Sequence, residues 1–441
     1  MASVIKIYAL FLGSALLMFG GGLQGLLLSV RGAEEDFSLL ALGLIGTGWS
    51  VGFVAGSLFV PMVVRKVGHI RAFSVMAAIG TITILLNLLW INDIGWIVLR
   101  ALSGFCFAGA AMIVESWLNE VADNRSRGTI FSIYVTINMA ASTLGQIAMS
   151  VTGTAGYLPF VIGAISFICA VLPTALTSSP QPKPLQSAKL DLGLLYRTSP
   201  VAAIAAFSCG MANGAFGTLA PVYGYEQGLD ASGIALLFAV AAILGAVAQV
   251  PFGRLSDRID RRLVLIGLSG FAALVGALTA LINPGAGWGM YVLFAAYGFA
   301  ANPIYAVAVA HANDFARDGD FAKIAGGMLL ILGLGLAIGP AVASIIMGIW
   351  HPVGLFVVTA TFHGALAGTA YLRMRVRKGL DAAERAPFQP MSDKQVTPET
   401  FVLDPRADSD ADEIPVQREA AVPEELIETA EAEGDVQDGK I

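Results

Sequence analysis

Two ionisable side chains, Arg100 and Glu115, stand inside one otherwise apolar stretch, residues 95–118. Ionisable groups are costly inside a membrane-spanning helix and usually serve substrate or proton movement there. On one helix the two would lie on similar faces but ~22 Å apart, too far for an ion pair. Arg100 could hold an anion, or be a structural arginine that extends to the outer interface. Glu115 could take up a proton or line the inner mouth, or be an interfacial acid tied to Arg125 or Arg127.

Uncharged polar side chains deep in other apolar stretches form a second set of candidates. Each could line a cavity or make a hydrogen bond between helices. They are Gln24, Asn138, Gln146, Asn213, Asn302 and Tyr305.

The sequence carries no pattern for metal, cofactor or catalytic chemistry. The four histidines share no ligand spacing, and the three cysteines stand far apart without a CxxC pair, so neither a metal site nor a disulfide framework is expected. No GxxxxGK[ST] occurs, which excludes ATP hydrolysis by a P-loop. No nucleophile, base and orienting group can be placed together. We therefore expect no cofactor, no metal and no enzymatic activity.

The elements that must position these residues are membrane-spanning helices. The 441 residues are 56% hydrophobic and only 13% charged, whereas a soluble domain is about 25% charged. Such a chain cannot cover itself with polar surface in water, and no basic, aromatic-rich patch suggests nucleic acid. A span needs ~20 apolar residues. Twelve stretches satisfy this, at roughly 5–30, 38–63, 72–91, 95–118, 129–152, 157–177, 200–223, 231–252, 263–283, 288–310, 323–349 and 354–373.

Lysine and arginine in the connecting segments predict the orientation. With the N-terminus in the cytoplasm, nineteen of them lie on the cytoplasmic side and only Arg31 lies outside. Both termini are therefore expected in the cytoplasm of a bacterial-type inner membrane.

Charge and composition divide the chain into four parts. Residues 1–177 and 200–375 are predicted to form two six-helix bundles, joined by a polar, proline-rich cytoplasmic linker at 178–199. Residues 376–441 form an acidic tail that is expected to be disordered, because it has too little apolar surface to fold alone.

The two halves are also similar to each other. A shift of about 192 residues places Gly22, Gly25 and Gly32 on Gly214, Gly217 and Gly224. Matches elsewhere follow in the same order, as a duplicated six-span unit would leave them. The natural substrate path is then the space between the two copies.

Three sets of residues resemble a known family. GRLSDRIDRR (253–262) resembles the loop motif GxLxDRxGRR of the major facilitator superfamily, and RALSGFCFAG (100–109) resembles its motif with a buried arginine. Three further stretches resemble the YcaD-like bacterial branch of that family. They are IVESWLNE (113–120), RSRGTIFSIY (125–134) and GHIRAF (68–73). The resemblance covers residues 5–375 and implies an all-α integral membrane fold of twelve helices in two pseudo-symmetric bundles.

The resemblance also implies roles for single residues. In the family the first, fourth, seventh and tenth helices line the central cavity, which favours Gln24, Arg100, Glu115, Asn213, Asn302 and Tyr305. Arg100 would couple substrate to proton movement. Asp257 would bond the N-terminal amides of the eleventh helix and latch the cytoplasmic side in the outward-facing state. Alternatively, its loop is a solvated charged segment that only sets topology. The latch motif comprises Gly253, Asp257, Arg258, Arg261 and Arg262.

Together these patterns predict a monomeric secondary transporter that moves a small solute by alternating access in the lipid bilayer. Proton coupling and efflux are favoured, because the candidate groups are Glu and Arg and the other cavity candidates are uncharged. One alternative is an importer of a small organic anion, with Arg100 as the anion's partner. Another, of a different class, is a membrane receptor that signals through the acidic tail.

Overall fold

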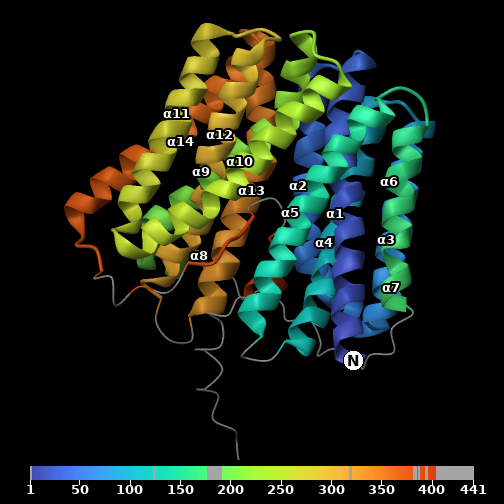
Figure 1. Ribbon diagram of the computed structural model, residues 1–441, viewed down its shortest axis with the longest axis horizontal. Helices are drawn as coiled ribbons and strands as arrows, with labels where there is room; N and C mark the ends of the chain where they lie inside the picture. The colour runs from blue at the N-terminus through green and yellow to red at the C-terminus, as the bar shows by residue number, and fades with distance from the viewer. Residues whose placement is uncertain are drawn as a thin grey trace, which may run out of the picture.

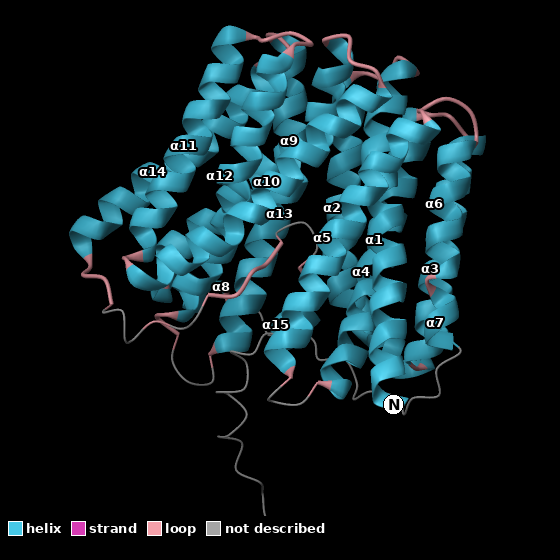
Figure 2. Cartoon of the chain, in the orientation of Figure 1, coloured by secondary structure: helices cyan, strands magenta, loops and turns pink. Residues whose placement is uncertain are grey.

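The computed structural model describes residues 2–122, 126–175, 191–316, 320–380, 385, 388–392 and 396–403, and within these ranges the chain is helical with short connections and no strand (Figure 2). The helices are α1 (Ala2–Glu34), α2 (Leu39–Val67), α3 (His69–Leu89), α4 (Asp93–Val121), α5 (Arg127–Thr152), α6 (Leu158–Cys169), α7 (Val171–Ala175), α8 (Leu192–Thr198), α9 (Pro200–Glu226), α10 (Ala231–Arg258), α11 (Arg261–Ile282), α12 (Trp288–Asn313), α13 (Phe321–Ile349), α14 (Gly354–Val376) and α15 (Pro398–Leu403).

Eleven of the described helices are long and apolar enough to cross a membrane. The sixth predicted stretch corresponds to α6 and α7, which follow one another and are separated only at Ala170. Pro173 explains the interruption, because it has no N–H to donate to the carbonyl of Cys169. The predicted all-α fold is thereby confirmed for the described residues.

Polar residues at helix starts and a glycine turn set the helix boundaries. Ser38, Asn92 and Asp230 each accept a hydrogen bond from a backbone N–H in the first turn of α2, α4 and α10. Between α2 and α3 the chain reverses at Gly68, whose φ of 84° is a conformation that other residues rarely adopt.

The helices pack as two groups, α1–α7 and α9–α14, which lie side by side (Figure 1). Equivalent pairs make close crossings in each group. A Cβ on Gly52 of α2 would lie 1.8 Å from the carbonyl oxygen of Ala101 in α4, and one on Gly298 of α12 would lie 2.2 Å from that of Ala241 in α10. Small residues allow such close approach where lipid offers no hydrophobic driving force between helices.

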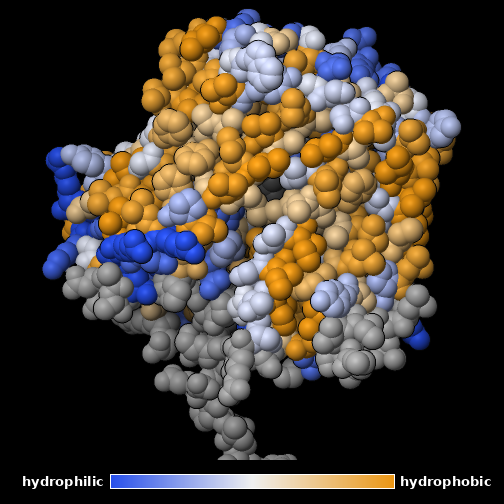
Figure 3. All heavy atoms as spheres, in the orientation of Figure 1, coloured by the Kyte–Doolittle hydropathy of each residue, from blue (hydrophilic) through white to orange (hydrophobic). Residues whose placement is uncertain are grey.

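The outer flank of the helices is apolar. Large hydrophobic side chains such as Val98, Val151, Leu281 and Val292 are exposed. Figure 3 shows apolar side chains over the visible flank, with hydrophilic ones gathered toward its two ends. An exterior of this kind suits a surrounding of lipid rather than water.

The two groups touch at one end of the molecule and are separated by another segment at the other end. We call the end that carries Arg65, Lys66, Arg258 and Arg373 the basic end. At the opposite end the Ser232 hydroxyl of α10 donates to the carbonyl of Ser150 in α5 over 3.3 Å. Further in, the Thr47 hydroxyl of α2 donates to the carbonyl of Ala337 in α13 over 2.6 Å. At the basic end, α15 packs on α4 and α13 (Figure 2).

Two stretches differ from the sequence-based expectation. The predicted linker contains helix α8, with Asp191 as its N-cap, while its residues 178–190 lie outside the described part. The tail from residue 376 was expected to be disordered, but residues 396–403 include a helix, and Met391, Val396 and Phe401 are buried. These apolar residues cannot fold alone, yet they bury against the two helix groups. Residues 404–441 lie outside the described range.

Candidate functional site

A cavity lies between the two helix groups, and we call it the central cavity. It encloses about 970 Å³, part of it open to solvent. Its walls come from α1, α2, α4 and α5 on one side and α9, α10 and α13 on the other. The lining residues are Gly21, Gly22, Gly25, Leu26, Ser29, Ile45, Gly46, Trp49, Ser50, Arg100, Phe107, Ser142, Gln146, Asn213, Gly214, Gly217, Thr218, Phe238 and Leu336.

Arg100 is the one charged residue among those that line the cavity. Its Nη1 donates to Oε1 of Gln24 over 3.2 Å, and its guanidinium carbon lies 5.7 Å from the centre of the Trp49 ring. Among the described residues, Nε of Arg100 and Nε2 of Gln24 are buried donors without a hydrogen-bond partner. The cavity therefore contains a positive charge with unused donors and no acid beside it.

The backbone fixes Arg100 early in α4. Asn92 caps the helix, and the indole N–H of Trp96 donates to the carbonyl of Asn87 over 3.0 Å, which holds the start of α4 against the end of α3. Arg100 follows seven residues after Asp93, so it lies ~10 Å along the helix from the opposite end.

Equivalent glycines of the two halves leave the cavity open. Gly25 of α1 and Gly217 of α9 both line it, and a Cβ on either would meet nothing within 4 Å. These two glycines were matched by the internal repeat, and the structure places both on the same cavity.

The structure places the predicted cavity residues in different surroundings. Arg100 and Asn213 line the central cavity, whereas Gln24 is not part of its wall and is linked to it only through its hydrogen bond with Arg100. Asn302 instead points at α10, where Gly245 leaves room for its amide, and Tyr305 is fully buried within the second group.

Gln146 was disfavoured by its helix number, yet it lines the cavity, and its Oε1 has no hydrogen-bond partner among the described residues. Trp49 was not singled out from the sequence at all. An aromatic residue in an apolar stretch gives no signal of its own, because most such residues only pack.

Glu115 lies away from the central cavity, toward the basic end of α4, and its side chain is fully buried. Its carboxylate accepts from the Tyr134 hydroxyl over 2.7 Å, from the Thr400 hydroxyl over 2.9 Å and from the Thr397 hydroxyl. The alternative ion pair of Glu115 with Arg127 is not among the contacts of Glu115 with described residues, and Arg125 lies outside the described residues.

The residues of the predicted latch form a charged cluster at the basic end of the second group. Arg261 is buried and donates from Nε to Asp314 over 2.7 Å and from Nη1 to Asp257 over 3.0 Å. Arg262 pairs with Asp260 and also donates to the carbonyl of Arg377 over 2.7 Å.

Two members of the motif meet the C-terminal segment, and one points to solvent. Asp257 accepts from the backbone N–H of Phe388 over 3.1 Å, and the Phe388 ring covers Gly253. Arg258 is exposed. Within the described chain, the Asp257 carboxylate bonds to Arg261 and Phe388, so its latch to the start of α13 stays a prediction for another conformation.

Asp260 carries the one pKa shift in this cluster that bears on its stability. Burial by itself would raise the pKa of this carboxyl, but hydrogen bonds from the side chain and backbone of Arg262, with the nearby positive charge, lower it below the ordinary value. The pair is thus an ionised one, and it fixes the start of α11.

Comparison with known proteins agrees with this architecture. The model of the Major Facilitator Superfamily matches residues 10–284 and 202–407. An uncharacterized MFS-type transporter of Enterobacter sp. (strain 638) is 26% identical over 350 residues, covering 78% of this chain and 88% of that protein. The uncharacterized MFS-type transporter YcaD of Escherichia fergusonii is 25% identical over 333 residues, covering 75% and 85%.

Two solved structures share the fold. The crystal structure of nucleoside transporter NupG superposes with a TM-score of 0.69 at 14% identity, covering 85% of this chain and 100% of that one. A bacterial homologue of the human lysosomal transporter Spinster gives a TM-score of 0.68 at 18% identity, covering 86% and 97%. The resemblance to the superfamily and to its YcaD-like branch, drawn from the sequence motifs, is confirmed.

Proposed function

Because the chain belongs to the major facilitator superfamily of secondary transporters, we propose that it moves a small organic anion through the central cavity, with Arg100 as the anion's ligand. The observation that carries the proposal is the lone guanidinium. A buried charge without a counter-charge is costly, and an anionic solute supplies the missing partner. Nε of Arg100, on the charged residue that lines the cavity, is a buried donor without a partner among the described residues, and Nε2 of Gln24, on the residue that Arg100 bonds, is a second.

The rest of the cavity suits the organic part of such a solute. Trp49, Phe107 and Phe238 provide apolar walls, while Ser50 and Thr218 provide hydroxyls that can fix orientation. A carboxylate or similar planar anion matches the fork of donors that a guanidinium presents.

The residues that line the cavity favour transport of an organic anion over efflux of a cationic or neutral solute. A cationic solute would meet Arg100 with no acid among the lining residues to offset it. A neutral apolar solute would leave the guanidinium unpaired and further removed from water. The receptor alternative rested on the acidic tail, most of which lies outside the described residues.

Proton coupling enters the proposal through Glu115. It is a carboxyl fully buried inside a span, and groups of this kind mark proton pathways in transporters. It lies ~22 Å from Arg100 along α4, so any coupling between them acts through movement of the helix groups and not through direct contact.

Orientation is also part of the proposal. The excess of lysine and arginine at the basic end supports a cytoplasmic location for that end, and with it for both termini. The contacts between Ser232 and Ser150 and between Thr47 and Ala337 would then close the outer side.

A ligand-stabilisation screen of the purified full chain tests the proposal. Panels of organic anions, cations and neutral compounds are compared for their effect on the melting temperature. We expect stabilisation by anions that is lost in Arg100→Gln. It should persist in the control Arg31→Gln, because Arg31 pairs with Glu34 and Glu35 away from the cavity. Stabilisation only by cations or neutral compounds, unchanged in Arg100→Gln, would refute the anion assignment.

A further inference from the structure

The described part of the C-terminal segment, residues 385, 388–392 and 396–403, lies between the two helix groups at the basic end. We call these residues the C-terminal plug. Met391, Val396 and Phe401 are buried apolar side chains, and Thr397 is fully buried. A loop that merely hung from the bundle would leave such residues in water.

Helix α4 of the first group holds one side of the plug. The hydroxyls of Thr397 and Thr400 both donate to the carboxylate of Glu115. Nδ2 of Asn119 donates to Oε2 of Glu399 over 3.3 Å. Glu115 lies ~9 Å inside the end of α4, so these contacts are within the mouth and not at its rim.

Helix α10 of the second group holds the other side. Nε2 of Gln249 donates to the carbonyl of Met391 over 3.2 Å. Asp257 accepts from the backbone N–H of Phe388, and Nη1 of Arg385 donates to the carbonyl of Ile259 over 2.6 Å. Gln249 is ~14 Å from the end of α10, so the plug reaches at least as far along the second group as along the first.

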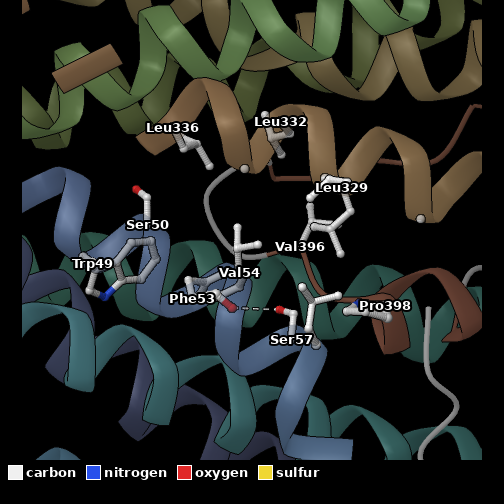
Figure 4. A pocket seen from close by; sticks show the side chains of 14 residues that line it. Trp49, Ser50, Phe53, Val54, Ser57, Leu329, Leu332, Leu336, Val396 and Pro398 are labelled. Atoms are coloured by element: carbon white, nitrogen blue, oxygen red, sulfur yellow. Dashed lines mark hydrogen bonds between the residues drawn. The ribbon is translucent and has the colours of Figure 1, made fainter. Parts of the chain in front are cut away.

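The plug also ends the route from the central cavity. A second cavity lies between α2 and α13, with about 530 Å³ of space that is in part open to solvent, and Val396 and Pro398 line it at the basic end (Figure 4). This cavity shares Trp49, Ser50 and Leu336 with the central cavity, so the two adjoin. A solute that moved along α2 and α13 toward the basic end would meet Val396 and Pro398.

We propose that the C-terminal plug is an autoinhibitory element that blocks the basic-end mouth of the transporter and holds it in this conformation. The block has two parts. The plug fills the mouth, and it also occupies Glu115 and Asp257, one on each helix group. Closure of the two groups at the basic end, which alternating access requires, needs the space that the plug occupies. The proposal rests on the route through the central cavity but not on the nature of the solute.

Cysteine accessibility tests the proposal without a known substrate. In full-length protein with Cys106, Cys169 and Cys209 replaced by alanine, Ser57→Cys places a single thiol on the wall of the second cavity, where Ser57 is buried. A membrane-impermeant maleimide is applied to vesicles that expose the basic end. Thr397→Val/Thr400→Val keeps chain length and side-chain volume but removes both hydrogen bonds to Glu115.

The labelling rate should rise by roughly tenfold or more in the double variant, the population shift expected from losing hydrogen bonds to a carboxylate. A stop after Gly379, which removes the plug, should raise it at least as much. Two controls should label as slowly as the parent. A stop after Leu403 removes only the acidic remainder, and Thr369→Val removes a hydroxyl that bonds within its own helix.

Equal labelling of the parent and of both plug variants, whether fast or slow, would overturn the proposal, because the plug would then not be what limits access to the mouth. Fast labelling after the stop at Leu403 would also overturn it, since the acidic remainder and not the plug would be the barrier. Neither outcome bears on the binding of anions at Arg100. Failure of the plug and failure of the anion assignment are therefore distinguishable.

Discussion

Replacing Arg100 by glutamine should change stability and anion affinity in opposite directions. The substitution removes a buried charge whose desolvation costs several kcal/mol. The compensating contacts are one hydrogen bond from the charged guanidinium to Gln24, worth about 1.5–3 kcal/mol, and a cation–π contact with Trp49, worth about 0.5–2 kcal/mol. We therefore expect the ligand-free Arg100→Gln protein to melt at the same temperature as the parent or higher.

The affinity for the anion should fall in the same variant. A hydrogen bond to a charged group contributes about 1.5–3 kcal/mol, which corresponds to a Kd weakened roughly 10- to 150-fold. The assay is a titration of thermal stability and of binding heat with the anion that the screen identifies. A structural arginine would give the reverse pattern, with a lower melting temperature and an unchanged Kd. That result would refute the assignment of Arg100 as a ligand.

Three further predictions test other parts of the account. Gly217→Leu should abolish solute flux in proteoliposomes while the melting temperature stays near that of the parent, because the new side chain enters open space in the cavity. The control variant Gly270→Leu, which also enters open space but lies on α11, should transport the solute normally. Glu115→Gln should abolish accumulation driven by a pH gradient but spare exchange of solute across the membrane, and undiminished gradient-driven uptake would remove Glu115 from the coupling. Because Arg262 lowers the pKa of Asp260, the stability that this pair contributes is present above the ordinary pKa of an aspartate and is lost as the pH falls through the lowered value. Asp260→Asn should therefore make the melting temperature depend less on pH in that acidic range, as measured by thermal unfolding at a series of pH values.

Eleven of the twelve predicted spans correspond to single long apolar helices, and they could be predicted from the sequence because lipid leaves the backbone few alternatives to a helix. Under that constraint, a minimum length of ~20 apolar residues is enough to identify a membrane-spanning helix. The interruption between α6 and α7 follows from Pro173. Gly25 and Gly217 could be matched because duplication preserves the small residues where the two halves face the same cavity.

The direction in which each polar side chain points could not be predicted from helix number. Asn302 turns to α10 because Gly245 leaves a gap there, and that gap depends on how two helices cross. Gln146 lines the cavity for the same kind of reason, because the close crossing of α1 and α5 at Gly22 and Gly145 determines which face of α5 is exposed to it.

The C-terminal plug was also beyond a prediction from composition. Residues 376–441 are polar and acidic on average. The mean composition of such a segment does not reveal that three single apolar residues in it are buried. Met391, Val396 and Phe401 are buried only because the two helix groups offer a mouth in which to place them. Thr397 and Thr400 acquire a role solely through Glu115, which is more than 280 residues away in sequence.

Protection of a single thiol in the central cavity tests the central claim most directly. Gly25→Cys, in protein with Cys106, Cys169 and Cys209 replaced by alanine, places a thiol in open space on the cavity wall. We expect a small maleimide to label it, an organic anion to slow the labelling with a half-maximal concentration equal to its Kd, and Arg100→Gln to remove that protection. Labelling that no anion slows, or protection that survives in Arg100→Gln, would contradict the account.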